Sequence, residues 1–363
     1  MKMSLVEHAV IGMIVLAIIL AAFLWVGRDK LRYRKLVATT IAMTFFLVIL
    51  GAFVRLSDAG LGCPDWPGCY GNFTPHHSVD SIRAAETNQP GGPVTMAKAW
   101  KEMAHRYLAM VVGALIAAIS FAAWRNRRAW DESPGLATIT ALAVIFQAAL
   151  GAWTVTMLLK PAIVTSHLLG GVAILSLLVW LYWRQFARSA PAPPWATGIM
   201  ALRGLRIHGL AALVAILLQI MLGGWVSTNY AALACTDFPL CNGEIVPAMD
   251  FANAFHIIRP LGMGPDGELL KLEALRAIQW THRLGAVIVV LIVGSFVMSL
   301  LKLQSGRKAA KMLMALIVLQ LLLGVSNVWF SLPIWVAVAH NGMAAILFAQ
   351  LMLINLRLFP HRN

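Results

Sequence analysis

Four histidines are notable because each lies within a long apolar segment. They are His105, His167, His282 and His340. Each lies five or six residues inside one end of its segment, which is about 8 Å into the hydrocarbon of a membrane at 1.5 Å per residue. Ionisable side chains are costly at such a depth and usually mark a functional site. A single membrane histidine can also serve as a helix–helix hydrogen-bond partner, but four at matched positions favour ligand binding.

In chain order the histidines form two pairs, and the members of each pair lie in different apolar segments. Zinc and copper sites usually have three or four clustered donors, often with Cys, Asp or Glu among them. Two imidazoles that face each other suit the two axial positions of a haem iron instead. Nearby glycines would leave room for a flat porphyrin, and these are Gly170, Gly171, Gly285 and Gly342.

The two histidine pairs differ in one neighbouring side chain. Glu102 lies three residues before His105, which places both on the same face of a helix. The equivalent residue before His282 is the amide Gln279. A carboxylate near a porphyrin edge can take part in a reaction, so we expect the first site to be reactive and the second to transfer electrons or to be structural. The alternative is that Glu102 is an exposed residue at the membrane interface.

Arg106 and Arg283 directly follow the first histidine of each pair. At the membrane interface they could pair with haem propionates. They could equally extend towards lipid headgroups, and the sequence leaves both interpretations open.

The four cysteines lie in two polar loops, as Cys-x5-Cys motifs at 63–69 and 235–241. Cysteines confined to loops on the oxidising side of a membrane predict two local disulfides, Cys63–Cys69 and Cys235–Cys241. Such short loops lose little chain entropy on closure, so a redox or loop-shaping role stands beside a structural one.

The elements that position these residues are membrane helices. The chain of 363 residues is 60% hydrophobic and 12% charged, and its mean hydropathy is +0.77. Soluble domains contain about 25% charged residues, so this composition excludes a soluble enzyme, a disordered protein and a nucleic-acid binder. Nine apolar segments are long enough to span a lipid bilayer. They cover residues 7–27, 37–57, 101–123, 136–158, 162–183, 208–229, 277–301, 310–331 and 334–356.

The net charge of +14 indicates membrane topology. Lys and Arg concentrate in short loops, such as residues 28–35 and 125–128, which identifies these loops as cytoplasmic. The first segment is predicted to be a retained helix, because the basic cluster follows it and no cleavage site precedes that cluster. We therefore expect the N-terminus and both cysteine loops outside, on the periplasmic side of a bacterial inner membrane, and the C-terminus inside.

The chain contains an internal repeat. Residues 51–69, GAFVRLSDAGLGCPDWPGC, align with residues 223–241, GGWVSTNYAALACTDFPLC. Both halves contain an even number of helices and insert the same way up, so we expect a pseudo-twofold axis along the membrane normal. The fold class is an all-α integral membrane protein of two four-helix bundles plus one extra N-terminal helix. The predicted parts are an N-terminal helix and basic loop (1–36), a first bundle (37–184), a cytoplasmic linker (185–207) and a second bundle (208–357).

A weaker repeat lies within each half. Glycines recur on the helices that carry no histidine of a pair, at Gly51, Gly151, Gly223 and Gly324. Gln147, Gln219 and Gln320 each precede one of them by four residues. Such glycines usually allow close helix packing, and a ligand against bare backbone is the alternative.

In combination, Glu-x2-His-Arg at 102–106, a second histidine in the last helix of the half, their repeats at His282 and His340, and the paired cysteines resemble the haem A synthase family. The resemblance covers residues 37–356. It implies two four-helix bundles and oxidation of the C8 methyl of haem O to a formyl group, giving haem A for terminal oxidases. The helix at 7–27 is additional to the eight-helix core of that family.

The same resemblance implies the roles of individual residues. His105 and His167 would ligate the substrate haem O, Glu102 would be catalytic, and His282 and His340 would be the axial ligands of a haem b cofactor. Cys63 and Cys69 match a pair linked to activity, and Cys235 and Cys241 match the pair of the cofactor half. The expected partners are haem O, the lipid bilayer, a haem O synthase, an electron donor and further copies of the chain, and no nucleic acid.

Two other functions fit parts of the pattern. A di-haem b electron-transfer cytochrome would explain the four histidines but not the difference between Glu102 and Gln279. A transporter would explain the repeat, but the histidines lie near one surface and midplane charges are missing. A haem prenyltransferase is set aside because the sequence has no pair of Asp-rich motifs.

Overall fold

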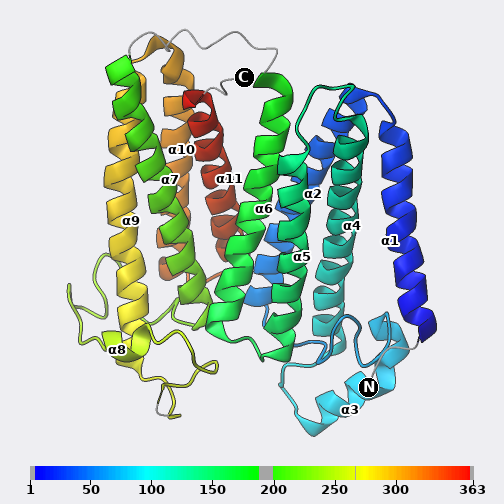
Figure 1. The fold of residues 1–363 in the computed structure, drawn as a ribbon. Coiled ribbons are helices and arrows are strands. Elements are labelled where there is room, and N and C mark those ends of the chain that lie inside the picture. The colour runs from blue at the N-terminus through cyan, green and yellow to red at the C-terminus, as the bar shows by residue number, and fades with distance from the viewer. Residues whose placement is uncertain (1–4, 188–198, 266, 360–363) are drawn as a thin grey trace. The chain divides into compact units, whose positions relative to one another are not determined.

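A computed structural model describes residues 5–187, 199–265 and 267–359, which are helical and contain no β-strand (Figure 1). The α-helices are α1 (Leu5–Val26), α2 (Lys30–Leu56), α3 (Val79–Asn88), α4 (Met96–Asn126), α5 (Gly135–Thr156), α6 (Pro161–Ala187), α7 (Ile199–Thr228), α8 (Phe251–Ala254), α9 (Leu272–Leu301), α10 (Arg307–Trp329) and α11 (Ile334–Leu358). Two 3-10 helices, η1 (Pro75–Ser78) and η2 (Gln304–Gly306), precede α3 and α10.

Within the described residues, nine helices are long and apolar enough to cross a membrane, which confirms the predicted number. Several begin earlier than predicted. Helix α4 begins at Met96 rather than 101 and α9 at Leu272 rather than 277, because the helix continues through segments in which charged residues such as Lys98 and Glu273 interrupt the apolar pattern. The side chain of Thr95 accepts a hydrogen bond from the Lys98 N–H and so caps the extended end of α4.

Met1–Tyr182 form one compact unit. Helix α4 packs against α1, α2 and α5. The core of the unit joins side chains from five helices, among them Val26, Tyr33, Ile116, Ala137 and Leu178. Only 6% of the most apolar window of α1 is buried, so most of that helix presents apolar side chains to lipid.

Trp183–Asn363 form the second compact unit. Helix α7 packs against α9, α9 against α10, α10 against α11, and α11 against α7, so each of the four contacts two others. Helix α6 ends at Ala187 and helix α7 begins at Ile199, so both helices extend into the predicted linker of residues 185–207. Residues 188–198 of that linker lie outside the described part of the chain. The pseudo-twofold relation between the units stays a prediction.

Contacts within the first unit define its two ends (Figure 1). The N–H of Phe73, in the loop of the first cysteine pair, donates to Glu7 Oε1 at 3.0 Å, near the start of α1. At the other end, Lys30 Nζ lies 2.6 Å from Glu132 Oε1, and Trp130 donates to the Arg28 carbonyl. The start of α1 and the cysteine loop therefore share one end of the unit, as the charge distribution predicts.

Candidate functional site

The first histidine pair comes together inside the first unit. His105 is the tenth residue of α4, and His167 is the seventh residue of α6. Their ring centroids lie 6.4 Å apart. An imidazole nitrogen bonds a metal at about 2.0–2.1 Å and lies about 1 Å from its ring centre, so two rings on one metal would be separated by roughly 6 Å. The observed spacing therefore fits two axial ligands of one iron.

The second pair has a similar setting in the second unit. His282 is the eleventh residue of α9 and His340 the seventh of α11, and both helices pack against α7 and α10. The predicted position five or six residues inside the helix is right for His167 and His340. It is wrong for His105 and His282, because α4 and α9 extend beyond their apolar runs.

A glycine on a neighbouring helix faces each of the four rings. Cβ atoms built on Gly151, Gly223 and Gly324 would each lie 3.1 Å from a histidine Cε1, and one on Gly51 would lie 3.0 Å from His105 Nε2. Side chains at these positions would push the rings away. The glycines thus admit imidazole rings, a role that their regular spacing alone could not distinguish from simple helix packing.

Two of the glycines that were expected to admit a porphyrin have another neighbour. A Cβ on Gly170 would collide with Gln147 Oε1, and one on Gly285 would collide with Gln219 Oε1. The space above these two glycines is therefore filled by glutamine side chains. The approach of a porphyrin to these two glycines stays a prediction.

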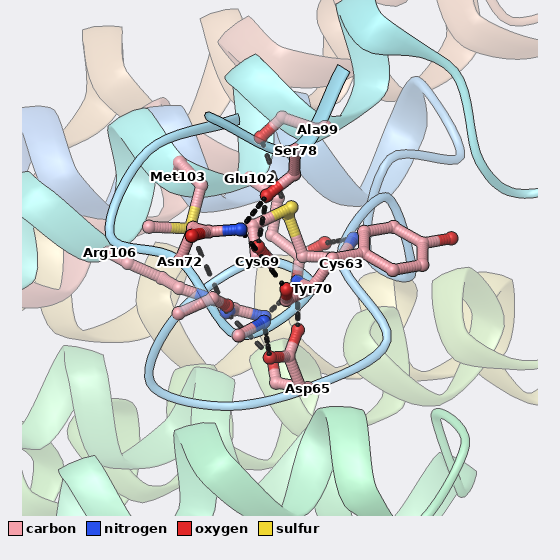
Figure 2. Close-up of a disulfide and its surroundings, with 12 residues drawn as sticks. Cys63, Asp65, Cys69, Tyr70, Asn72, Ser78, Ala99, Glu102, Met103 and Arg106 are labelled. Carbon is pink, nitrogen blue, oxygen red and sulfur yellow. Dashed lines mark hydrogen bonds and ion pairs between the residues drawn. A yellow bond between two sulfur atoms is a disulfide. The ribbon is translucent and has the colours of Figure 1, made fainter. Parts of the chain in front are cut away.

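Glu102 is buried, with 5% of its surface exposed, so the interpretation as an exposed interfacial residue is wrong. Its Oε2 accepts a hydrogen bond of 2.8 Å from the backbone N–H of Cys63. Its Oε1 lies 2.5 Å from Arg106 Nη2 in an ion pair (Figure 2). Two donors therefore fix a carboxylate one helical turn before His105, in surroundings where water contributes little screening.

Arg106 fastens the first cysteine loop. Its Nη1 donates to the carbonyls of Asp65 (2.8 Å), Pro67 (3.3 Å) and Gly68. Figure 2 shows how these contacts gather the loop around the guanidinium group. In this structure Arg106 binds protein acceptors, and a propionate contact for it stays a prediction.

Both predicted disulfides are present, Cys63–Cys69 and Cys235–Cys241. The two loops have a similar local structure, because the aspartate inside each motif accepts hydrogen bonds from two backbone N–H groups. Asp65 accepts from Tyr70 and Gly71. Asp237 accepts from Asn242 and Gly243, and the Gly243 N–H is the main cause that lowers the pKa of the Asp237 carboxyl.

The second unit lacks the link between loop and carboxylate. Gln279 is as buried as Glu102, with 5% exposed, and its Oε1 has no hydrogen-bond partner among the described residues. Arg283 donates to the carbonyls of Leu240 (2.6 Å) and Cys235 (3.1 Å), so it fastens the second loop as Arg106 fastens the first. The Nε of Arg283 is buried without a partner. The propionate role predicted for Arg283 is untested.

The residues fit a haem in each unit. Buried imidazole nitrogens without a partner, His167 Nδ1 and His340 Nδ1, lie beside glycines that no Cβ fills. In the described part of the chain, no group of three or more His, Cys, Asp or Glu could hold a metal ion. Each site therefore offers two imidazoles, the donor set of a six-coordinate haem iron.

The fold and the site define a class: multi-pass α-helical membrane proteins with paired histidines inside the membrane-spanning helices. Comparison with known proteins narrows this class. A family described as cytochrome oxidase assembly protein matches residues 34–352, and the chain belongs to that family. Helix α1 precedes the matched region, in agreement with its prediction as an addition to the family core.

Relatives with curated names agree with the predicted family. The chain is 40% identical to the haem A synthase of Shewanella oneidensis over 322 residues, which cover 88% of this chain and 94% of the relative. It is 28% identical to that of Halalkalibacterium halodurans, over 71% of this chain and 84% of the relative. It is also 28% identical to that of Caulobacter vibrioides, over 85% and 90%.

Proposed function

We propose that the protein is a haem A synthase, which oxidises the C8 methyl group of haem O to a formyl group. One observation carries this proposal beyond the family name. The first unit joins a histidine pair to a buried carboxylate, Glu102, whereas the second unit has a histidine pair and the amide Gln279. One site with a buried carboxylate and one with an amide in its place suit an enzyme with a substrate haem and a cofactor haem.

The first bundle, residues 37–184, holds haem O between His105 and His167. The second, residues 208–357, would hold haem b through His282 and His340, and that group would supply one-electron redox chemistry when bound. The spacing of the first pair and the glycine that faces each ring support this assignment.

Glu102 acts on the methyl group that is oxidised. Removing electrons from a methyl group on a porphyrin edge leaves positive charge on the carbon and makes its protons more acidic. A carboxylate fixed by the Cys63 N–H and by Arg106 can stabilise that charge or accept a proton, without first reorganising. Arg106 and the first cysteine loop hold the carboxylate in place.

The protein is a multi-pass membrane protein, and we place it in a bacterial plasma membrane with the cysteine loops and haem sites towards the periplasm. The excess of basic residues in the opposite loops supports this orientation. A haem O synthase as the source of substrate, an electron donor and further copies of the chain complete the proposed set of partners.

The test is the haem content of cells that make haem O but no haem A. Expression of this chain should yield haem A in an acid–acetone extract, resolved by chromatography, and the purified protein should contain haem b. A purified protein with haem b in both units and no haem A in the cells would instead identify a di-haem electron-transfer cytochrome. His282→Ala and His340→Ala should each remove most of the low-spin haem b spectrum.

A further inference from the structure

A glycine brings the first cysteine loop into direct contact with the backbone of α4. A Cβ built on Gly62 would lie 2.6 Å from the carbonyl carbon of Lys98 and 2.7 Å from the backbone nitrogen of Ala99. Real Cβ atoms essentially never come within 3.0 Å of such a neighbour, and ordinary van der Waals contact begins at 3.4 Å. The neighbouring atoms are helix backbone, so they cannot turn aside as a flexible side chain can. The loop therefore rests on α4 at a distance that only glycine permits.

This contact lies beside the hydrogen bond that fixes Glu102. Cys63 follows Gly62 directly, and its N–H donates to Glu102 Oε2 at 2.8 Å, while its Sγ lies 3.8 Å from the Ala99 carbonyl oxygen (Figure 2). Cys63 and Ala99 are fully buried in one small core. An alanine at position 62 would have to move about 0.8 Å away from α4 to reach ordinary contact. A retreat of that size along the bond leaves about 3.6 Å between nitrogen and oxygen, where no hydrogen bond remains.

The second cysteine loop repeats the turn but not the glycine. The Gly62 N–H donates to the Ala59 carbonyl at 3.1 Å, and the N–H of the equivalent Ala234 donates to the Ala231 carbonyl at the same distance. The two loops therefore make the same backbone turn at this place. The first differs from the second by the absence of one methyl group.

The helix side of the contact differs as well. The residue of α9 that is equivalent to Ala99 is Arg276, three positions before Gln279, so both sides of the contact carry more atoms in the second unit. There, Gln279 Oε1 has no hydrogen-bond partner among the described residues. A glycine contact between loop and helix and a side chain held by the loop thus occur together in the first unit, and the described part of the second unit has neither.

We propose that Gly62 is a positioning residue for the proposed reaction. Because it has no side chain, the first cysteine loop descends onto α4 and the Cys63 N–H reaches Glu102. The link to haem O oxidation rests on the proposed function. Arg106 separately holds the loop through three carbonyls, so Gly62 sets the place of the Cys63 N–H rather than the attachment of the loop. The second unit keeps the loop attachment through Arg283 and has no carboxylate for the loop to hold.

The experiment adds one methyl group, Gly62→Ala, to the full-length protein. Deuterium exchange of the purified protein should be faster by about 10-fold or more at the Cys63 amide, because a hydrogen bond to a charged group contributes about that factor. The second cysteine loop of the same molecule, residues 230–246, is the internal reference and should not change. In cells that make haem O, haem A formation should fall by about 10-fold or more. The purified variant should still contain haem b and bound haem O.

Two further variants test the same contact. Gly60→Ala adds a methyl group in the same loop, where a Cβ meets only the flexible end of Leu159, at 3.3 Å. This matched control should change neither the exchange of the Cys63 amide nor haem A formation. Ala99→Val enlarges the α4 side of the contact and should act in the same direction as Gly62→Ala, which keeps the inference testable if Gly62→Ala folds poorly.

The outcomes separate this inference from the proposed function. A wild-type protein without haem b, in cells that form no haem A, would overturn the proposed function, and the exchange of the Cys63 amide would still show whether Gly62 sets the contact. If the wild type forms haem A, the inference is wrong when Gly62→Ala leaves either the exchange or haem A formation at the wild-type level. It is also wrong if Gly60→Ala has the same effect, or if Gly62→Ala loses haem b together with haem A, since a general loss of structure would then explain the result.

Discussion

Glu102 and Gln279 occupy equivalent places in the two units and are equally buried. Their side chains have almost the same shape, so the difference between them is charge and the capacity to accept a proton. Cys63 N–H and Arg106 surround Glu102 with positive partial and full charge, which stabilises the ionised form. Burial opposes this stabilisation, so removing either donor would leave the ionised form less favourable.

Glu102→Gln should therefore abolish haem A formation while the protein still folds and binds haem, because the second unit already accommodates glutamine at this place. Loss of one such electrostatic contact costs about 100-fold or more in rate. The measurement is the ratio of haem O to haem A in extracts, with the haem b spectrum as the control for folding. A ratio equal to that of the wild type would remove Glu102 from the mechanism.

At the scale of elements, helices approach closely where a glycine meets an imidazole ring. Gly324→Ala would place a Cβ 3.1 Å from His340 Cε1, on helices that pack directly against each other. Because the ring must move or the helices must separate, we expect a cost of about 1–3 kcal/mol and weaker binding of haem b. Haem b content per protein and thermal stability in detergent are the measurements.

Gly294→Ala is the matched control, since a Cβ there meets nothing within 4 Å. It lies inside α9, where alanine favours the helix by up to about 1 kcal/mol over glycine. This substitution should leave haem b content unchanged and stability equal or slightly higher. Equal behaviour of the two variants would show that the glycines do not make room for the rings.

The two cysteine loops are also elements whose roles can be separated. Replacing Cys63 and Cys69 with Ser loosens the loop whose N–H holds Glu102, and an unpartnered buried acceptor costs about 1–3 kcal/mol, or roughly 5- to 150-fold in rate. Replacing Cys235 and Cys241 with Ser frees no carboxylate, because no hydrogen bond joins Gln279 Oε1 to the described part of that loop. Haem A formation should fall much further in the first double variant than in the second, and equal losses would contradict this coupling.

At the scale of the whole molecule, the sequence predicts the membrane-spanning helices, their topology and the internal repeat, because these features depend on the local composition of the chain. Nine apolar runs were sufficient to predict the helices. The clusters of Lys and Arg were sufficient to predict that the start of α1 and the first cysteine loop lie at the same end of the first unit. The repeat identified the four histidines and the contrast between Glu102 and Gln279. These features are local or periodic, so no knowledge of packing is required.

Contacts between distant segments could not be predicted in this way. The donor that fixes Glu102 is the N–H of Cys63, 39 residues away, and it reaches the carboxylate only because the loop folds back over α4. Gln147 and Gln219 were visible in the repeat, yet their place above Gly170 and Gly285 depends on how neighbouring helices are rotated. Helix starts were also missed, since capping by Thr95 extends α4 beyond its apolar run.

The orientation of the whole chain in the membrane can be tested with reporter fusions. Five Lys and Arg residues at 28–35 follow α1, so α1 should insert with its end in the cytoplasm and its start outside. An alkaline phosphatase domain inserted at Gly267, in the second cysteine loop, should be active, and one fused after Asn363 should be inactive. Green fluorescent protein after Asn363 should fluoresce, because it folds in the cytoplasm.

Thiol labelling checks the same topology without a fusion. A membrane-impermeant maleimide added to intact spheroplasts should label the chain only after reduction, because the proposed topology places all four cysteines in outer loops and they form disulfides. Removing the five basic residues at 28–35 should weaken the orientation of α1, while the basic loop at 125–128 still holds α4 and α5. Labelling that required disruption of the membrane, together with an active phosphatase after Asn363, would place the haem sites on the cytoplasmic side and contradict the proposed orientation.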